Sequence, residues 1–126
     1  TLFKNSGIYH LRLGATGSPT SAAKNLDHAD IDSLFAFAKA TGIKVIYSLH
    51  ARDSVATAQY VWENYRPYLD RFAFDNEPDN SKEGGSGTAV GRYTNYLAGW
   101  NNLARAVTAA TPGGKFAGPD AAFRTE

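Results

Sequence analysis

The sequence contains no cysteine, no methionine and only three histidines. Without cysteine, the chain forms no disulfide and performs no thiolate chemistry. The histidines, at positions 10, 28 and 50, lack the HxH or HxxxH spacing typical of metal ligands, so we expect neither a bound metal nor another cofactor. The lack of methionine, even at position 1, favours a processed or excised piece over a complete translation product.

Long apolar runs and blocks of one charge are also missing. No segment reaches the roughly 20 apolar residues that span a bilayer, and the first residues lack the basic start and apolar middle of a signal peptide. Thirteen basic side chains nearly balance twelve acidic ones. The composition therefore argues against nucleic acid or a membrane as partner and favours a neutral or modestly charged ligand.

The sequence does contain enough apolar residues for a core, since 43% of its 126 residues are hydrophobic. Short apolar runs predict four strands, at 8–15, 43–51, 71–74 and 115–120. The first run is closed by glycine and reads as a strand buried on both faces.

Three amphipathic helices are predicted between these strands. The first is capped by Asp27 or Asp30 and ends at Gly42. The second ends before Pro67, and the third ends at 111–114. The side chains expected to face the sheet are Ile31, Leu34, Phe35 and Ala38 in the first helix, Val55, Ala58, Val61, Trp62 and Tyr65 in the second, and Tyr93, Tyr96, Leu97, Trp100, Leu103, Ala104 and Val107 in the third.

Strands that alternate with helices predict successive right-handed βαβ units on a parallel sheet, and hence an α/β fold. A doubly wound sheet would carry a phosphate-binding loop after the first strand, but Gly14 and Gly17 lack the third glycine and the Walker lysine of such loops. A (β/α)8 TIM barrel explains more, because polar residues follow every strand and barrel active sites lie at the carboxyl ends of the strands. A barrel takes about 250 residues, so residues 1–126 are expected to be roughly its amino-terminal half, with about four strands and three helices.

Residues 72–81, FAFDNEPDNS, run an apolar strand directly into acids and amides. Asn76-Glu77-Pro78 at this strand end resembles the acid/base motif of the retaining (β/α)8 glycoside hydrolases of clan A. The aspartate after the proline, the later AGPD and the early LRLGATGS are most similar to glycoside hydrolase family 79, the β-glucuronidase and heparanase group. Asp75 departs from the family pattern, which more often has a small residue there. This acid can either raise the pKa of Glu77 by like-charge repulsion or turn away and pair with Arg12 or Arg71. The resemblance covers nearly the whole chain in element order and rests on three short motifs.

The resemblance implies hydrolysis of O-glycosidic bonds by a retaining double displacement, with β-glucuronides as the suggested substrates. By this resemblance, Glu77 is the expected general acid/base, and Asn76 is expected to form a hydrogen bond with the sugar hydroxyl next to the anomeric carbon. This chemistry needs a protonated carboxylic acid and a second carboxylate about 5–5.5 Å away as nucleophile. The family takes that nucleophile from its seventh strand, which this sequence does not contain. The further residues expected to bind substrate are Arg12, His50, Asp79 and Asp120.

Simpler interpretations remain open for these residues. Glu77 and Asp79 can be solvated loop acids, Arg12 can be a structural ion-pair partner, and His50 can cap its strand. A calcium loop is disfavoured, because Asn80 stands where such a loop needs glycine. The alternative function is a non-catalytic carbohydrate-binding or scaffold barrel that keeps the motif.

The expected partners are an oligosaccharide or glycoside substrate and the remaining half of the barrel, and the expected location is secreted or extracellular. Four strands cannot close a barrel, so both sheet edges would expose unpaired backbone groups. We therefore expect the isolated residues to be prone to aggregation.

Overall fold

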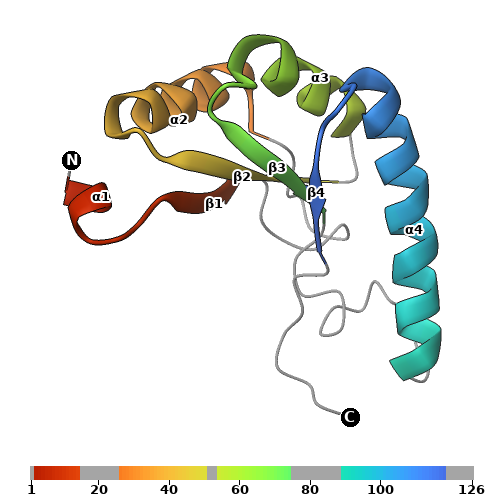
Figure 1. Ribbon diagram of the computed structural model, residues 1–126. Helices are drawn as coiled ribbons and strands as arrows, with labels where there is room; N and C mark the ends of the chain where they lie inside the picture. Colours follow the sequence, from red (N-terminus) through yellow and green to blue (C-terminus); the bar gives the residue numbers. More distant parts are fainter. Residues whose placement is uncertain (1, 15–25, 51–53, 75–88, 119–126) are drawn as a thin grey trace.

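The structure of the chain is a computed structural model that describes residues 2–14, 26–50, 54–74 and 89–118 (Figure 1). In chain order its elements are α1 (Leu2–Asn5), β1 (His10–Gly14), α2 (His28–Thr41), β2 (Lys44–Leu49), α3 (Ser54–Tyr65), β3 (Leu69–Phe74), α4 (Ala89–Ala110) and β4 (Phe116–Ala117). The four predicted strands and three predicted helices are all present, and the short helix α1 was not predicted. The prediction of an α/β fold with alternating strands and helices is confirmed.

All four strands are parallel and lie in the order β1-β2-β3-β4. Figure 1 shows α2, α3 and α4 in an arc along one side of this sheet. The core fills the space between them, and residues from all three helices and the sheet belong to one buried cluster. We call the side of the sheet that faces these helices the covered face and the opposite side the open face.

Helix α2 forms where local signals agree. The Asp27 side chain accepts a hydrogen bond from the backbone N–H of Asp30 at 3.0 Å, so Asp27 is the N-cap. Gly42 ends the helix in the left-handed region, with a φ of 71°, where glycine carries no Cβ penalty. Between these caps, Ile31 and Phe35 are almost fully buried, as their spacing predicts.

Alternation along the strands separates the two faces. Tyr47 pairs with Phe72 and is fully buried on the covered face, where its ring stacks on Phe35 of α2 with centroids 6.2 Å apart. The Tyr47 hydroxyl is buried too, and no residue of the described ranges offers it a hydrogen bond. Its neighbour Ser48 pairs with Ala73 on the open face.

A bulge interrupts the pairing between β2 and β3. Val45 pairs with Leu69, but the next residue, Ile46, pairs with Arg71, so Asp70 is an extra residue in β3. Because of this extra residue, the side chains that follow it in β3 point to the same faces as their partners in β2, and Phe72 lies opposite Tyr47 on the covered face.

Three burial predictions were wrong. The first strand is not buried on both faces, because β1 lies at the edge of the described sheet and Leu13 is 37% exposed. Val55 of α3 is also exposed, whereas Ser54 and Thr57 of that helix are buried in its place. The third error concerns the amino-terminal half of α4, where Tyr93 and Leu97 were expected to face the sheet but are 57% and 39% exposed. The described sheet has no strand on the outer side of β1, α4 extends beyond the sheet, and Val55 lies off the buried stripe of α3 that includes Ala58 and Val61.

A carboxylate links α2 to α3 on the outside of the molecule. The Oδ1 atom of Asp32 accepts hydrogen bonds from the hydroxyls of Tyr60 at 2.7 Å and Tyr65 at 2.5 Å. The ring of His28 stacks on that of Tyr60, with centroids 3.7 Å apart. The hydrogen bond from Tyr65, followed by that from Tyr60, lowers the pKa of Asp32 below its usual value.

Candidate functional site

Because the four strands are parallel, their carboxyl ends meet at one edge of the sheet, which we call the carboxyl edge. The six residues predicted to catalyse or to bind substrate come from or follow these strands. Arg12 and His50 lie within the described residues. The others, Asn76, Glu77, Asp79 and Asp120, lie outside the described residues.

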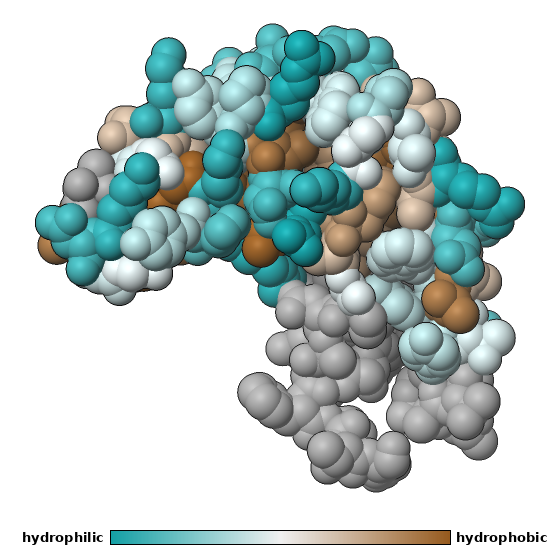
Figure 2. All heavy atoms as spheres, viewed as in Figure 1, coloured by the Kyte–Doolittle hydropathy of each residue, from teal (hydrophilic) through white to brown (hydrophobic). Residues whose placement is uncertain are grey.

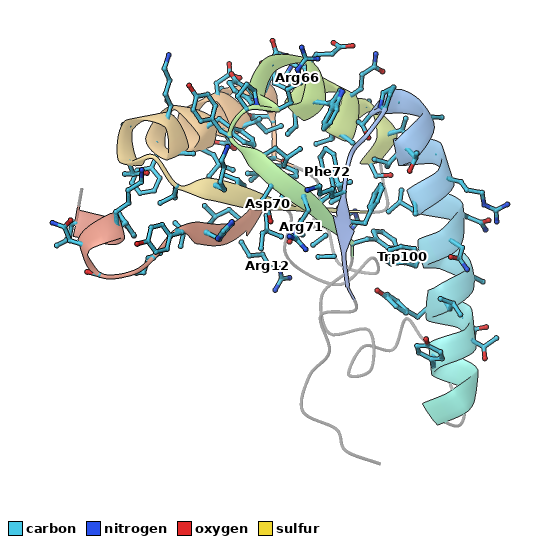
Figure 3. All side chains as sticks on the ribbon, in the orientation of Figure 1. Arg12, Arg66, Asp70, Arg71, Phe72 and Trp100 are labelled. Atoms are coloured by element: carbon cyan, nitrogen blue, oxygen red, sulfur yellow. The ribbon has the colours of Figure 1, made fainter. Side chains whose placement is uncertain are left out.

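Arg12 is the middle residue of β1 and lies on the open face. Its Nε donates a hydrogen bond of 2.9 Å to the hydroxyl of Ser48, which is buried in the neighbouring strand β2. The register explains this contact, since Arg12 pairs with Ile46 and Gly14 pairs with Ser48. Figure 3 shows Arg12 on the side of the sheet away from α2 and α3. The bond to Ser48 fixes the inner part of the guanidinium while the side chain remains exposed.

Gly14 brings the two strands unusually close at the carboxyl edge. Its φ of 125° is one that other residues rarely adopt, and a Cβ placed there would lie 2.5 Å from the carbonyl oxygen of Ser48. Only glycine therefore fits at the end of β1. The end of β1 therefore lies directly against the backbone of Ser48, whose hydroxyl accepts the hydrogen bond from Arg12.

His50 is the first residue after β2, two positions beyond Ser48, and it is only 6% exposed. Such burial limits the freedom of the imidazole and holds it close to the end of β2. The structure thus places the two described candidates on neighbouring strands, with His50 directly after β2 and Arg12 in the middle of β1.

Sequence reasoning missed Ser48. The residue was part of a predicted strand, and its partner lies 36 positions away in the chain. The available signal was alternation in IKVIYSLHA, which puts Ser48 on the same face as Ile46 and apart from the large buried residues. Pairing it with Arg12 required the register of two strands, which the sequence does not supply.

A second charged group, which sequence reasoning also missed, surrounds Asp70 in the first half of β3. Arg71 Nε lies 2.6 Å from Oδ2 of Asp70, and His10 Nε2 lies 4.0 Å from the same oxygen. The hydrogen bond from Arg71 lowers the pKa of Asp70, and the positive charges of Arg71, His10 and Lys115 act in the same direction. Figure 3 shows Asp70 and Arg71 side by side on β3. Asp70 and His10 lie near the amino ends of their strands, whereas Arg71 pairs with Ile46, as Arg12 does, so the two arginines lie at the same level of the open face on either side of β2. We assign the contacts of Asp70 to stabilisation of the sheet.

The position of Asp75 was left open, with Arg12 and Arg71 as possible partners. In the structure Arg71 bonds to its neighbour Asp70, and Arg12 bonds to Ser48. Asp75 itself lies outside the described residues.

The described part of the chain lacks two features that would indicate other kinds of site. Across these ranges, no group of three or more His, Asp or Glu side chains is placed to hold a metal ion. No helix within them combines the length and apolar character that a membrane span requires. Neither a protein-family model nor a curated protein sequence matches this chain.

Proposed function

We propose that the chain is roughly the amino-terminal half of a (β/α)8 barrel and belongs to the catalytic domain of a retaining glycoside hydrolase of clan A, most like family 79. The order β1-β2-β3-β4 supports a barrel, because the chain winds in one direction and the described helices α2, α3 and α4 all cover the same face of the sheet (Figure 1). A doubly wound sheet carries helices on both faces.

The observation that carries the proposed reaction is the place of Asn76-Glu77-Pro78. Strand β3 is a central strand of the sheet and ends at Phe74, and Glu77 follows three positions later in the sequence. Barrel enzymes take their catalytic groups from the carboxyl edge of the sheet. In the proposed mechanism Glu77 protonates the leaving glycosidic oxygen and later activates a water molecule.

The described residues give this site a cationic and polar neighbourhood. Arg12, oriented by Ser48, carries its charge on the open face one strand away from β3. Together with His50 at the end of β2, it is proposed to bind sugar hydroxyls or, in a glucuronide, the carboxylate. Asn76, Asp79 and Asp120 complete the proposed substrate contacts, and the nucleophile lies on the part of the barrel that this sequence does not include.

The decisive experiment is Glu77→Ala in the full-length protein, assayed on a natural glycoside and on an activated aryl β-glucuronide. An aryl leaving group needs little protonation, so the variant should lose cleavage of the natural glycoside yet still form the covalent intermediate from the aryl substrate. Azide needs no general base and should restore turnover, giving a glycosyl azide of retained configuration.

Glu83→Ala is the matched control, because it removes another carboxylate from the same polar stretch. It should keep the activity of the unaltered protein. Wild-type rates for Glu77→Ala on natural glycosides would refute the catalytic role, and an inverted azide product would refute the retaining mechanism. An unaltered protein that binds glycosides without any turnover would instead favour the non-catalytic carbohydrate-binding barrel.

A further inference from the structure

One face of α4 continues past the end of the sheet. Residues seven positions apart lie close to the same side of an α-helix, so Tyr93, Trp100 and Val107 share one face. Val107 is fully buried in the core, and the ring of Trp100 contacts that of Phe116 in β4, with centroids 6.0 Å apart (Figure 3). Tyr93, on the same face, is 57% exposed.

The relative lengths of helix and strands explain this change. At about 1.5 Å per residue, the 22 residues of α4 extend about 33 Å. At about 3.3 Å per residue, the six residues of β3 extend only about 20 Å. Since α4 follows β3, it begins at the carboxyl edge, and its first turns extend beyond that edge (Figure 1).

Gly118 marks the level of the carboxyl edge on α4. A Cβ at this residue, directly after β4, would lie 3.0 Å from the Tyr96 hydroxyl and 3.3 Å from the Trp100 Nε1. The polar ends of two aromatic side chains therefore meet the end of β4. Tyr93 lies one turn further along the helix, outward from this level.

Beside Tyr93, the exposed side chain of Leu97 follows at i+4. Figure 2 shows apolar surface next to paler residues along this part of α4. These two side chains are far fewer than the roughly 20–30 residues that each partner contributes to a stable protein interface. Their size suits a small ring better than another protein.

We propose that Tyr93, with Leu97 beside it, forms a sugar-binding subsite for a pyranose ring of an oligosaccharide substrate that extends beyond the reaction centre. This inference rests on the proposed glycosidase function. One side of a pyranose presents mainly C–H groups, which pack on the flat phenol ring, and the Tyr93 hydroxyl can bond a sugar hydroxyl. Tyrosine is suited to this role because it orders only two side-chain torsions when it binds.

The test compares Tyr93→Ala and Tyr93→Phe in the full-length protein on a disaccharide and a tetrasaccharide that end in the same β-glucuronic acid residue. Loss of an aromatic contact should weaken tetrasaccharide binding about tenfold more than disaccharide binding, read as the ratio of the two KM values. Tyr93→Phe keeps the ring and should retain most of the affinity. Calorimetry with the tetrasaccharide on a Glu77→Gln background measures the same difference without turnover.

Tyr9→Ala is the matched control, because Tyr9 is 56% exposed but precedes β1, at the opposite edge of the sheet. It should change neither KM. An equal change of both KM values in Tyr93→Ala would overturn the subsite, as would a lower melting temperature with unchanged tetrasaccharide binding, which would mean that the ring packs against another part of the protein. Failure of the proposed function is seen separately, as wild-type activity of Glu77→Ala on natural glycosides.

Discussion

Replacing Tyr47 with phenylalanine should stabilise the protein, although losing a buried tyrosine hydroxyl usually destabilises. The side chain is fully buried in β2, and the described residues offer its hydroxyl no hydrogen bond. Burying a hydroxyl without a partner costs about 1–3 kcal/mol in proteins. Phenylalanine keeps the ring and its stacking on Phe35, so Tyr47→Phe should raise the free energy of unfolding by about that amount.

The same substitution should change the response to alkaline pH. Burial raises the pKa of Tyr47 above the value of 10.0 that it has when the chain is unfolded. Above pH 10 the unfolded state therefore ionises while the folded state does not, so the free energy of unfolding falls as the pH rises. Tyr47→Phe removes this contribution, and its advantage over the unaltered protein should grow above pH 10.

Urea and thermal unfolding of the full-length protein at pH 7 and above pH 10 measure both effects. In a domain of about 150–250 residues, 1 kcal/mol corresponds to a shift of roughly 2–4 °C in melting temperature. Tyr65→Phe is the control, since it deletes a tyrosine hydroxyl that donates to Asp32 and should lower stability. Destabilisation by Tyr47→Phe at neutral pH would show that its hydroxyl is satisfied, and the reasoning would fail.

Two further predictions concern other parts of the fold. Gly14→Ala should destabilise the protein by about 1–3 kcal/mol in urea unfolding, because the new Cβ would meet the Ser48 backbone and φ is unfavourable for alanine. Gly99→Ala, in α4 with open space around it, is the control and should stabilise the protein by roughly 0.5–1 kcal/mol; equal effects of the two substitutions would contradict the close approach of Gly14 to Ser48. Asp32→Asn should lower the melting temperature at pH 7. The carboxylate contributes its full stability above the unfolded pKa of 3.8, and this contribution is lost as the pH falls from there through the lowered pKa of the folded state, so the difference should vanish in acid; a difference that persists would contradict the link between α2 and α3.

Features that depend on neighbours in the sequence were predicted well. The capping of α2 by Asp27 involves residues three positions apart, and the left-handed end at Gly42 needs only the absence of a side chain. The inward positions Ile31 and Phe35 follow from helical spacing alone. Local geometry decides each of these features, so a single sequence contains the necessary information.

Features that depend on distant partners were not predicted. Leu13 looked like a core residue, but its burial depends on how many strands flank β1. Arg12 was identified as a candidate, whereas its partner Ser48 became visible only with the register of β1 and β2. The exposure of Tyr93 depends on the length of α4 relative to the sheet, which helical spacing does not reveal.

The bulge at Asp70 also determines where β3 can lose a residue. Deleting Asp70 would leave Arg71 opposite Ile46 and Phe72 opposite Tyr47, so the core would keep its contacts and the loss would fall on the charges around Arg71. Deleting Ala73 instead would place Phe74 opposite Ser48 on the open face, because side chains alternate between the two faces along a strand. Shortening of β3 is therefore tolerable on one side of Phe72 and disruptive on the other.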